Sequence, residues 1–255
     1  MTFEIAKIEI KDSEVKKRVT ALFAPPKKRA GSLFTTEVAD NKLDYISIYQ
    51  PTTTSVEAKD IYQGMNMGDM YSRKGLIGNN VTMIPLVMWG SRNYFDKNLK
   101  KSVCRSPDGE IPVHDRISKK CEGCPKARYS KGNPSSCAEG INILAIPADF
   151  SSRPVVFQFS KTSYQVGKNI ALQANQFGDE VYDSCFSLET QRADGKAYFV
   201  YKIARVAETK KKFRPLLKAL QDHFSEDITK RITRHRADLT VSTEVQKIDA
   251  LDDID

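Results

Sequence analysis

The sequence predicts a mainly β chain with a few helices, in the α+β class. Short runs of β-branched and aromatic residues, separated by Gly, Pro and Asn, recur from Ser32 onward. Two longer stretches have helical periodicity, and one 34-residue stretch containing four cysteines has no apolar periodicity. At 255 residues the chain is long enough to bury one substantial core or two small ones.

Runs typical of strands are separated by turn residues along most of the chain. They cover residues 32–38, 42–50, 81–90, 141–148, 153–160, 181–192 and 196–207. Asp194-Gly195 lies between the last two runs and predicts a hairpin there. The Gly- and Met-rich stretch 61–80 is typical of a flexible loop, and residues 91–101 are expected to form a basic and aromatic bridge.

Two helices are predicted in the second half of the chain. The first covers residues 161–178, with Thr162 or Ser163 as its N-cap and Gly178 at its end. The second covers residues 213–239. A shorter helical candidate precedes Pro25-Pro26, because a proline pair stops a helix.

The order of these elements indicates an oligonucleotide/oligosaccharide-binding (OB) fold. A helix between the third and fourth strands of a small five-stranded barrel is that arrangement. We expect a basic N-terminal arm at 1–31 and an OB core at 32–206, with a zinc insert at about 100–140. A C-terminal helical segment at 207–238 and a flexible acidic tail at 239–255 follow.

The four clustered cysteines predict a structural zinc site. Cys104, Cys121, Cys124 and Cys137 lie in a segment rich in Gly, Pro, Ser and Lys that has no core of its own. Thiolates are soft ligands, and tetrahedral four-cysteine coordination is usual for structural zinc. The Cys121–Cys124 turn supplies two ligands, with Gly123 free to adopt a positive φ.

These cysteines have alternative uses. Disulfides are the main rival, and an iron–sulfur cluster is another, although the long first spacer is unlike ferredoxin runs. His114 is a candidate to replace one ligand. A zinc deaminase needs H-x-E and P-C-x-x-C, but the chain has His114-Asp115-Arg116, and Lys120 precedes Cys121.

The charge is unevenly distributed. The net charge is +8, and residues 244–255 contain five acids and one base, which leaves +12 on residues 1–243. A basic body suits a polyanion, because each phosphate that it neutralises releases counterions, although a solvated surface would also explain part of the excess. The acidic end is expected to bind partner proteins through Asp249, Asp252, Asp253 and Asp255, or to act as a solubility tail.

The compartment is predicted to be reducing and cytoplasmic. The charged N-terminus is unlike a secretory signal, and no apolar run approaches the length of a membrane span. The fifth cysteine, Cys185, is left unpaired if the other four bind metal, and we expect a core thiol in a strand.

Cations and aromatic rings alternate along several segments, as single-strand binding requires. The candidate contacts to nucleic acid are Trp89, Arg92, Tyr94, Phe95, Lys97, Lys100, Lys101, Arg105, Lys126, Arg128, Tyr129, Lys131, Lys161, Tyr198 and Lys202. Tyr94 and Tyr129 lie among polar residues and are expected to be exposed, whereas Phe157 and Phe159 are expected in the core. Tyr198 and Tyr201 have opposite facing, so only one points outward.

Residues 89–141 resemble bacteriophage-type single-stranded DNA-binding proteins. The resemblance lies in W-G-x-R-N-Y-F, C-R-S-P-D-G, C-x-x-C-P and a closing cysteine before a new strand. In the T4-type helix-destabilising proteins a zinc element is inserted into an OB barrel, but there a histidine joins three cysteines. The resemblance implies Cys104, Cys121, Cys124 and Cys137 as zinc ligands, and it implies that the acidic end recruits replication and recombination proteins. The terminal Pro-Phe of bacterial tails is absent.

The function expected from the sequence is non-enzymatic binding of single-stranded DNA in replication, recombination and repair. One zinc per chain would hold the insert, and a phage-encoded chain would act in the host cytoplasm. The alternative is a zinc-ribbon RNA-binding or transcription factor that acts with RNA polymerase. A metal-dependent nuclease or ligase fragment would need clustered carboxylates or an active-site lysine motif; Asp108 and Asp115 are instead typical turn formers. Oligomeric state is not predicted.

Overall fold

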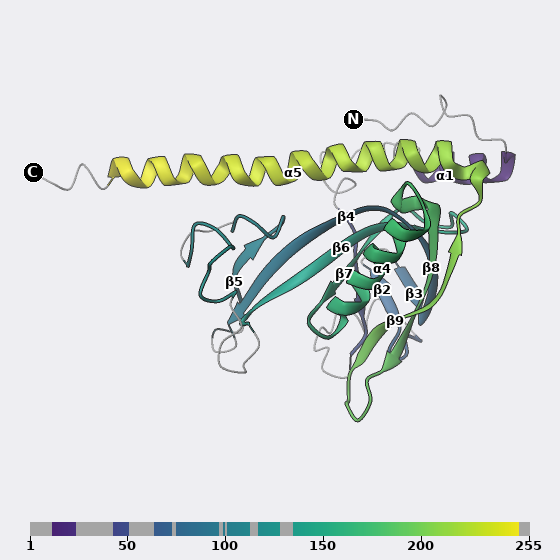
Figure 1. Cartoon of the computed structure of the whole chain (residues 1–255), viewed down its shortest axis with the longest axis horizontal. Coiled ribbons are helices and arrows are strands. Elements are labelled where there is room, and N and C mark those ends of the chain that lie inside the picture. The colour runs from purple at the N-terminus through teal and green to yellow at the C-terminus, as the bar shows by residue number, and fades with distance from the viewer. Residues whose placement is uncertain are drawn as a thin grey trace, which may run out of the picture. The chain divides into compact units, whose positions relative to one another are not determined.

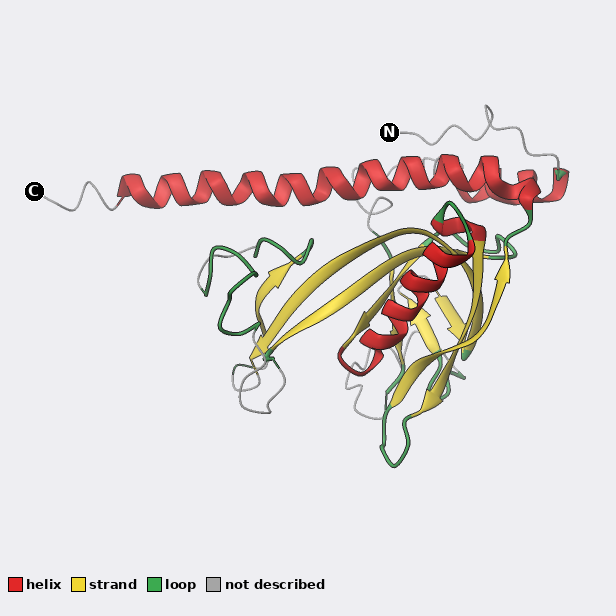
Figure 2. Ribbon diagram, in the orientation of Figure 1, coloured by secondary structure: helices red, strands yellow, loops and turns green. Residues whose placement is uncertain are grey.

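The computed structural model describes residues 12–23, 43–50, 64–72, 75–96, 99, 101–112, 117–127 and 135–249. Three α-helices and nine strands lie in these residues (Figure 1, Figure 2). The helices are α1 (Ser13–Phe23), α4 (Tyr164–Phe177) and α5 (Arg214–Asp249). The strands are β1 (Tyr45–Ile48), β2 (Met70–Ser72), β3 (Gly75–Gly78), β4 (Asn80–Asp96), β5 (Lys101–Ser106), β6 (Cys137–Pro147), β7 (Val155–Ser160), β8 (Ser184–Arg192) and β9 (Phe199–Glu208).

The chain is mainly β, as predicted, but its strands form one open mixed sheet. The strand order is β3-β2-β1-β7-β6-β4-β8-β9, and β5 pairs with β4 outside this path. β1 pairs with β7 in parallel, whereas the β4–β8 and β8–β9 pairs are antiparallel.

The expected closed five-stranded barrel is therefore wrong. In the described residues β3 and β9 end the order without pairing to each other. The strand order depends on long-range contacts that local patterns do not show: β4, with 17 residues, pairs with β8 at residues 80–83 and continues to Asp96.

The chain divides into two compact units, which we describe separately. Unit 1 comprises Met1–Met88 and Ile143–His223, and unit 2 comprises Trp89–Asn142 and Phe224–Asp255. The strands β4 and β6 and the helix α5 each contribute residues to both units.

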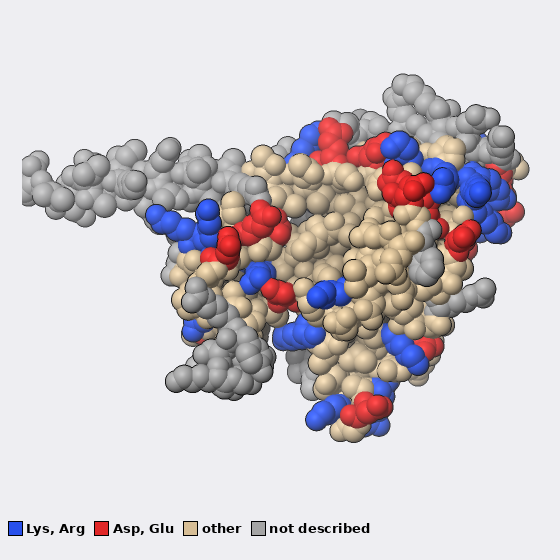
Figure 3. Space-filling view, viewed as in Figure 1, with Lys and Arg blue, Asp and Glu red and all other residues tan. Residues whose placement is uncertain are grey.

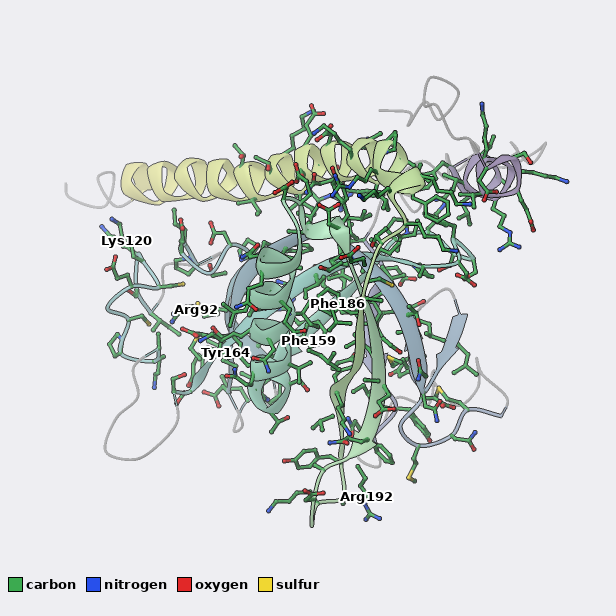
Figure 4. The ribbon with its side chains drawn as sticks, turned by 45° about the vertical axis from the view of Figure 1, so that its right-hand side comes forward. Arg92, Lys120, Phe159, Tyr164, Phe186 and Arg192 are labelled. Carbon is green, nitrogen blue, oxygen red and sulfur yellow. The ribbon has the colours of Figure 1, made fainter. Side chains whose placement is uncertain are left out.

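Aromatic residues of β7, β8 and β9 form the core of unit 1. Phe157 and Phe159 are almost fully buried, as predicted, and their ring centroids lie 6.4 Å apart. The ring of Tyr201 lies 5.1 Å from that of Phe159. Phe186 of β8 is also fully buried (Figure 4). Burying a side chain of this size stabilises the fold by about 1.5–3 kcal/mol.

The helix α4 packs on β7, β8 and β9 (Figure 2). Its buried positions Gly167, Ile170 and Ala174 recur at helical spacing, and two of them are small. Small residues on this stripe let the helix backbone approach the sheet closely. The predicted helix at 161–178 is thus confirmed, with a 3-10 turn at Lys161–Ser163 before it.

The C-terminal helix is longer than predicted. Leu216, Leu217 and Leu220 are buried in unit 1, and the helix also carries three acid–base pairs at i, i+4 spacing. The sequence predicts a flexible acidic tail at 239–255, but the helix continues through residues 239–249.

Candidate functional site

The β4–β5 hairpin of unit 2 positions most of the predicted contacts that the structure describes. Tyr94 pairs with Cys104, and the next pair is Phe95 with Ser102, so Val103 is an extra residue in β5. Such a bulge shifts the alternation of side chains by one residue. Arg105 and Ser102 therefore lie on the same face of the hairpin although they are three positions apart.

One face of this hairpin is exposed and carries both an aromatic ring and a cation. Phe95 is 45% exposed, and Arg105 and Asn93 are also exposed. Arg105 Nε donates to Ser102 Oγ at 3.0 Å, and Ser102 Oγ donates to Asn93 Oδ1. These bonds hold the Arg105 side chain on the face that Phe95 shares, across from Asn93. We name the set Asn93, Phe95, Ser102 and Arg105 the hairpin face.

The opposite face of the hairpin meets the cysteines. Tyr94 and Cys104 are cross-strand partners and both are half-buried. Lys126 Nζ lies 5.4 Å from the centroid of the Tyr94 ring, within range of a cation–π contact. Tyr94 was expected to be exposed, but alternation along β4 turns it toward the cysteines. Phe95 is the more exposed ring.

The four cysteines of unit 2 line one small pocket. Cys121, Cys124 and Cys137 are buried, and Cys104 is half-buried. The pocket also contains Tyr94, Pro112, Ile117, Ser118, Lys120, Lys126 and Ala127, and its volume is about 10 Å³. That is about the space of one water molecule, so the pocket has room for an ion and not for a substrate.

Backbone hydrogen bonds fix the segments that carry these thiols. Cys124 N donates to Cys121 O at 3.2 Å, which closes the expected turn, and Gly123 has the positive φ of 74° that this turn uses. Cys121 N donates to Glu110 O, and Cys137 N donates to Lys126 O. The turn is thus tied both to the loop after β5 and to the start of β6.

The loop after β5 is organised by a single carboxylate. Asp108 Oδ1 accepts from Ser106 Oγ at 2.8 Å and from the backbone N–H groups of Glu110 and Ile111. Asp108 is therefore a turn former, as the sequence indicated, and its bonds bring Glu110 to the place where it receives Cys121 N.

Burial raises the pKa of the Cys137 thiol to about 11. The neighbouring thiols of Cys104 and Cys121 add to the rise, and Arg92 opposes it. Burial also raises the pKa of Cys104, with Cys121 and Cys124 contributing. Cys104 and Cys137 are thus each close enough to other cysteines of the pocket for thiolate charges to repel, and a divalent cation would reverse this balance.

The donor set fits zinc in chemistry, though not yet in geometry. None of the five cysteines is in a disulfide, so all four thiols of the pocket are available. In the part of the chain that is described, no three His, Cys, Asp or Glu side chains are arranged so that they would hold a metal ion as they stand. Four thiols at the wall of one pocket would need to rotate inward to coordinate a shared ion.

Arg92 makes an ion pair with Glu139, which lies on β6. The Arg92 side chain is 22% exposed, and its ion pair links β4 to β6 at a residue that the sequence predicts as a nucleic-acid contact. Trp89 is half-buried in β4.

Unit 1 carries the other described contacts at the β8–β9 hairpin and before α4. Asp194-Gly195 forms the predicted turn, although the loop exceeds two residues, and Gly195 has a φ of 64°. Tyr198 is 36% exposed at this loop, whereas Tyr201 is 6% exposed, so one of the two tyrosines points outward, as expected. Lys202 lies 3.7 Å from Glu189, and Arg192 marks the end of the hairpin (Figure 4). Lys161 is exposed in the turn before α4.

The remaining predicted contacts are not described. Lys97, Lys100, Arg128, Tyr129, Lys131 and His114, the side chain of Lys101, and the tail residues Asp252, Asp253 and Asp255 lie outside the described residues, and Asp249 is the last residue of α5. The expected core thiol Cys185 is half-buried in β8.

Sequence reasoning missed Asn93 and Ser102 as members of the hairpin face. The sequence predicts a basic and aromatic bridge at residues 91–101, but β4 extends to Asp96, so side chains up to that residue alternate between two faces. The bulge at Val103 has no sequence signal that would have revealed it.

Comparisons with protein-family models, curated proteins and solved structures gave no match for this chain. Among the described helices, none combines the length and the apolar character that crossing a membrane requires.

Proposed function

We propose that this protein binds single-stranded DNA without sequence preference and protects it during replication, recombination and repair. The observation that carries the proposal is the hairpin face, where the exposed ring of Phe95 and the exposed cation of Arg105 share one side of the β4–β5 hairpin. Single-strand binding needs flat rings for bases and cations for phosphates, and this face offers both.

The chemistry of the hairpin face suits sequence-tolerant contact. A base that stacks on an aromatic ring contributes about 1–3 kcal/mol, whatever its identity. Arg105 donates to Ser102 through Nε, which leaves its two terminal nitrogens to reach a phosphate. The bond to Ser102 restricts the rotamers of Arg105, so less entropy is lost when a strand binds.

A bound zinc would hold the hairpin from its other face. Cys104, Cys121, Cys124 and Cys137 would be its four ligands, and zinc would supply a closed structural crosslink. Because Cys104 is the cross-strand partner of Tyr94, fixing Cys104 would also fix the strand that carries Phe95. In this role the four thiolates orient the hairpin and take no part in turnover, since we propose a protein that is not an enzyme.

Unit 1 would add further contacts. Tyr198, Lys202 and Lys161 are exposed and combine a ring with two cations. Glu189 partly neutralises Lys202 at 3.7 Å, so that residue is expected to contribute less than Arg105.

The acidic end completes the proposal. Five acids and one base in residues 244–255 would bind cationic surfaces on replication and recombination proteins in the cytoplasm. The same segment would compete with DNA for the basic body, whose charge is +12 by subtraction of −4 from +8.

Titration of the full chain with oligo-dT, an equal-length duplex and oligo-U, each at two salt concentrations, tests this function. We expect tight, salt-sensitive binding to oligo-dT, weaker binding to the duplex and intact substrate throughout. Failure to bind oligo-dT would refute the proposal. Preference for oligo-U would support the RNA-binding alternative, and metal-dependent loss of strands would support a nuclease.

A further inference from the structure

Exposed cations gather on unit 1, where α1 lies beside the junction between β9 and α5. Figure 3 shows Lys and Arg side chains crowded over this region of the surface, near the end of the chain's first helix. The cations are Lys16, Lys17, Arg18, Lys210, Lys211, Lys212 and Arg214, all of them exposed. We name this set the basic corner.

Specific bonds build the basic corner from two distant segments. Asp12 Oδ1 accepts from Val15 N at 3.2 Å and so caps α1, while Asp12 Oδ2 pairs with Lys212 Nζ at 2.7 Å. Lys212 holds the pKa of Asp12 below its ordinary value, with the Val15 bond adding to the effect. Val19 is fully buried, which anchors the helix on the unit. Both segments border one depression in the surface.

Ion pairs occupy three cations of the corner and leave four. Besides Lys212 with Asp12, Arg18 pairs with Glu14 and Arg214 pairs with Asp183, each at 2.8 Å. Within the described residues, Lys16, Lys17, Lys210 and Lys211 make no ion pair. Asp149 and Glu208 are the other acids that border the depression. The carboxylate of Asp149 accepts a hydrogen bond from Ser151 N, and Glu208 is exposed.

The basic corner differs from the hairpin face because the rings beside it are buried. Phe213 is 8% exposed and Phe150 is 1% exposed, and they pack edge to face with centroids 5.1 Å apart. Their faces are therefore not available to stack on bases. Lysines without rings attract phosphates and do not distinguish bases.

We propose that the basic corner binds the phosphodiester backbone of nucleic acid and makes no contact with bases. The site goes beyond the proposed function in that it treats single and double strands alike. The proposal rests on the proposed function only because that function identifies the polyanion as nucleic acid. Its contribution would be electrostatic, and it would therefore appear as salt dependence of the affinity.

The double variant Lys16→Ala/Lys210→Ala removes one unpaired cation from each segment. The control Lys168→Ala/Lys218→Ala removes the same charge from exposed positions on α4 and α5. Binding of each full-length protein to oligo-dT and to an equal-length duplex is measured as a function of salt. Inorganic polyphosphate, which has no bases, serves as a third probe.

We expect the slope of log affinity against log salt to fall by about 1.4 on oligo-dT in the corner variant, at about 0.7 per lost phosphate contact. The slope on the duplex and the affinity for polyphosphate should also fall relative to the control. Equal slopes in variant and control on both nucleic acids would overturn the proposal. If the wild type bound no nucleic acid, the proposed function would fail, and the polyphosphate measurement alone would decide whether the corner binds a phosphate chain.

Discussion

In unit 1, the side-chain amide of Gln50 makes with the backbone of Phe199 the two hydrogen bonds that a paired strand would make. Its Nε2 donates to Phe199 O at 2.7 Å, and its Oε1 accepts from Phe199 N at 2.7 Å. Gln50 follows β1, and Phe199 begins β9 at the end of the strand order. The sheet thus curls until its distant parts meet, and in the described residues the side chain of Gln50, not a strand pair, joins the end of β1 to Phe199.

Gln50→Ala should destabilise the protein by about 1–3 kcal/mol, because it leaves the half-buried N–H and C=O groups of Phe199 without the amide. Gln176→Ala, at an exposed position of α4, is the control and should change the free energy of unfolding little. Denaturant unfolding measures both. Equal stability of the two variants would show that the amide bridge is not a structural contact.

Gly68 supports the same junction by leaving room for a ring. A Cβ at Gly68 would lie 2.7 Å from the Phe199 ring, and the residue has a φ of 95°. Gly64 has a similar φ of 88° but no atom within 4 Å of such a Cβ. Both Ala variants carry backbone strain, so their difference isolates the collision.

We therefore expect Gly68→Ala to cost about 1–3 kcal/mol more than Gly64→Ala in unfolding free energy. Thermal or denaturant unfolding of the two variants is the measurement. If Gly64→Ala were equally destabilising, backbone strain alone would explain the loss of stability in both variants, and the close approach to the Phe199 ring would not contribute.

Local sequence patterns predicted most helices and strands, but they did not predict contacts between residues far apart in sequence. The strand at 153–160 and the helix at 161–178 were found because their apolar periods are clear. β2 and β3 were missed, since Met70–Ser72 and Gly75–Gly78 lie in a Gly-rich stretch without alternation. The bridge from Gln50 to Phe199 spans 149 residues and depends on how the sheet curls.

The candidate site was predicted in part for a similar reason. The cysteine spacing identified four thiols that the fold does bring to one pocket. Which of Tyr94 and Phe95 is the more exposed ring depends on the alternation of side chains along β4. The polar residues around Tyr94 favoured exposure of that ring, so composition indicated the less exposed of the two. The ion pair of Arg92 with Glu139 on β6 was not predicted, because the two residues lie far apart in sequence.

Tyr201 should make the stability of unit 1 fall in alkali. Burial raises the pKa of Tyr201 well above the ordinary value of 10.0. Above about pH 10 the unfolded chain releases this proton while the folded chain keeps it, so the folded state binds more protons and stability falls as pH rises. Tyr201→Phe should flatten this fall in denaturant unfolding between pH 9 and 11.

Tyr198→Phe is the matched control, since it removes the same hydroxyl from a side chain that is 36% exposed. It should retain the alkaline loss of stability seen in the wild type. A Tyr201→Phe variant that lost stability as steeply as this control would refute the assignment.

Zinc should bind at about one ion per chain and stabilise unit 2. Cys121→Ser removes one of the two ligands in the turn, so we expect loss of zinc in elemental analysis and earlier thermal unfolding. Cys185→Ser alters the cysteine of β8, in unit 1, and should keep the metal. A wild-type protein whose unfolding is unchanged after chelation, and which contains no zinc, would exclude the metal site.

Phe95→Ala should weaken binding to oligo-dT by about 1–3 kcal/mol, or roughly 5- to 150-fold, because a stacking ring is lost. Leu99→Ala is the control: Leu99 is 59% exposed, is apolar and has no ring. Phe95→Tyr should restore most of the affinity, since a phenol ring also stacks.

The salt slope should stay constant in the Phe95 variants, whereas Arg105→Ala should reduce it by about 0.7 with one fewer phosphate contact. Phe95→Ala binding like Leu99→Ala would remove the ring from the interface, and an unchanged salt slope in Arg105→Ala would remove the cation. Because Phe95 and Arg105 share one face of a two-stranded hairpin, loss of both effects would leave the hairpin face without a role in binding.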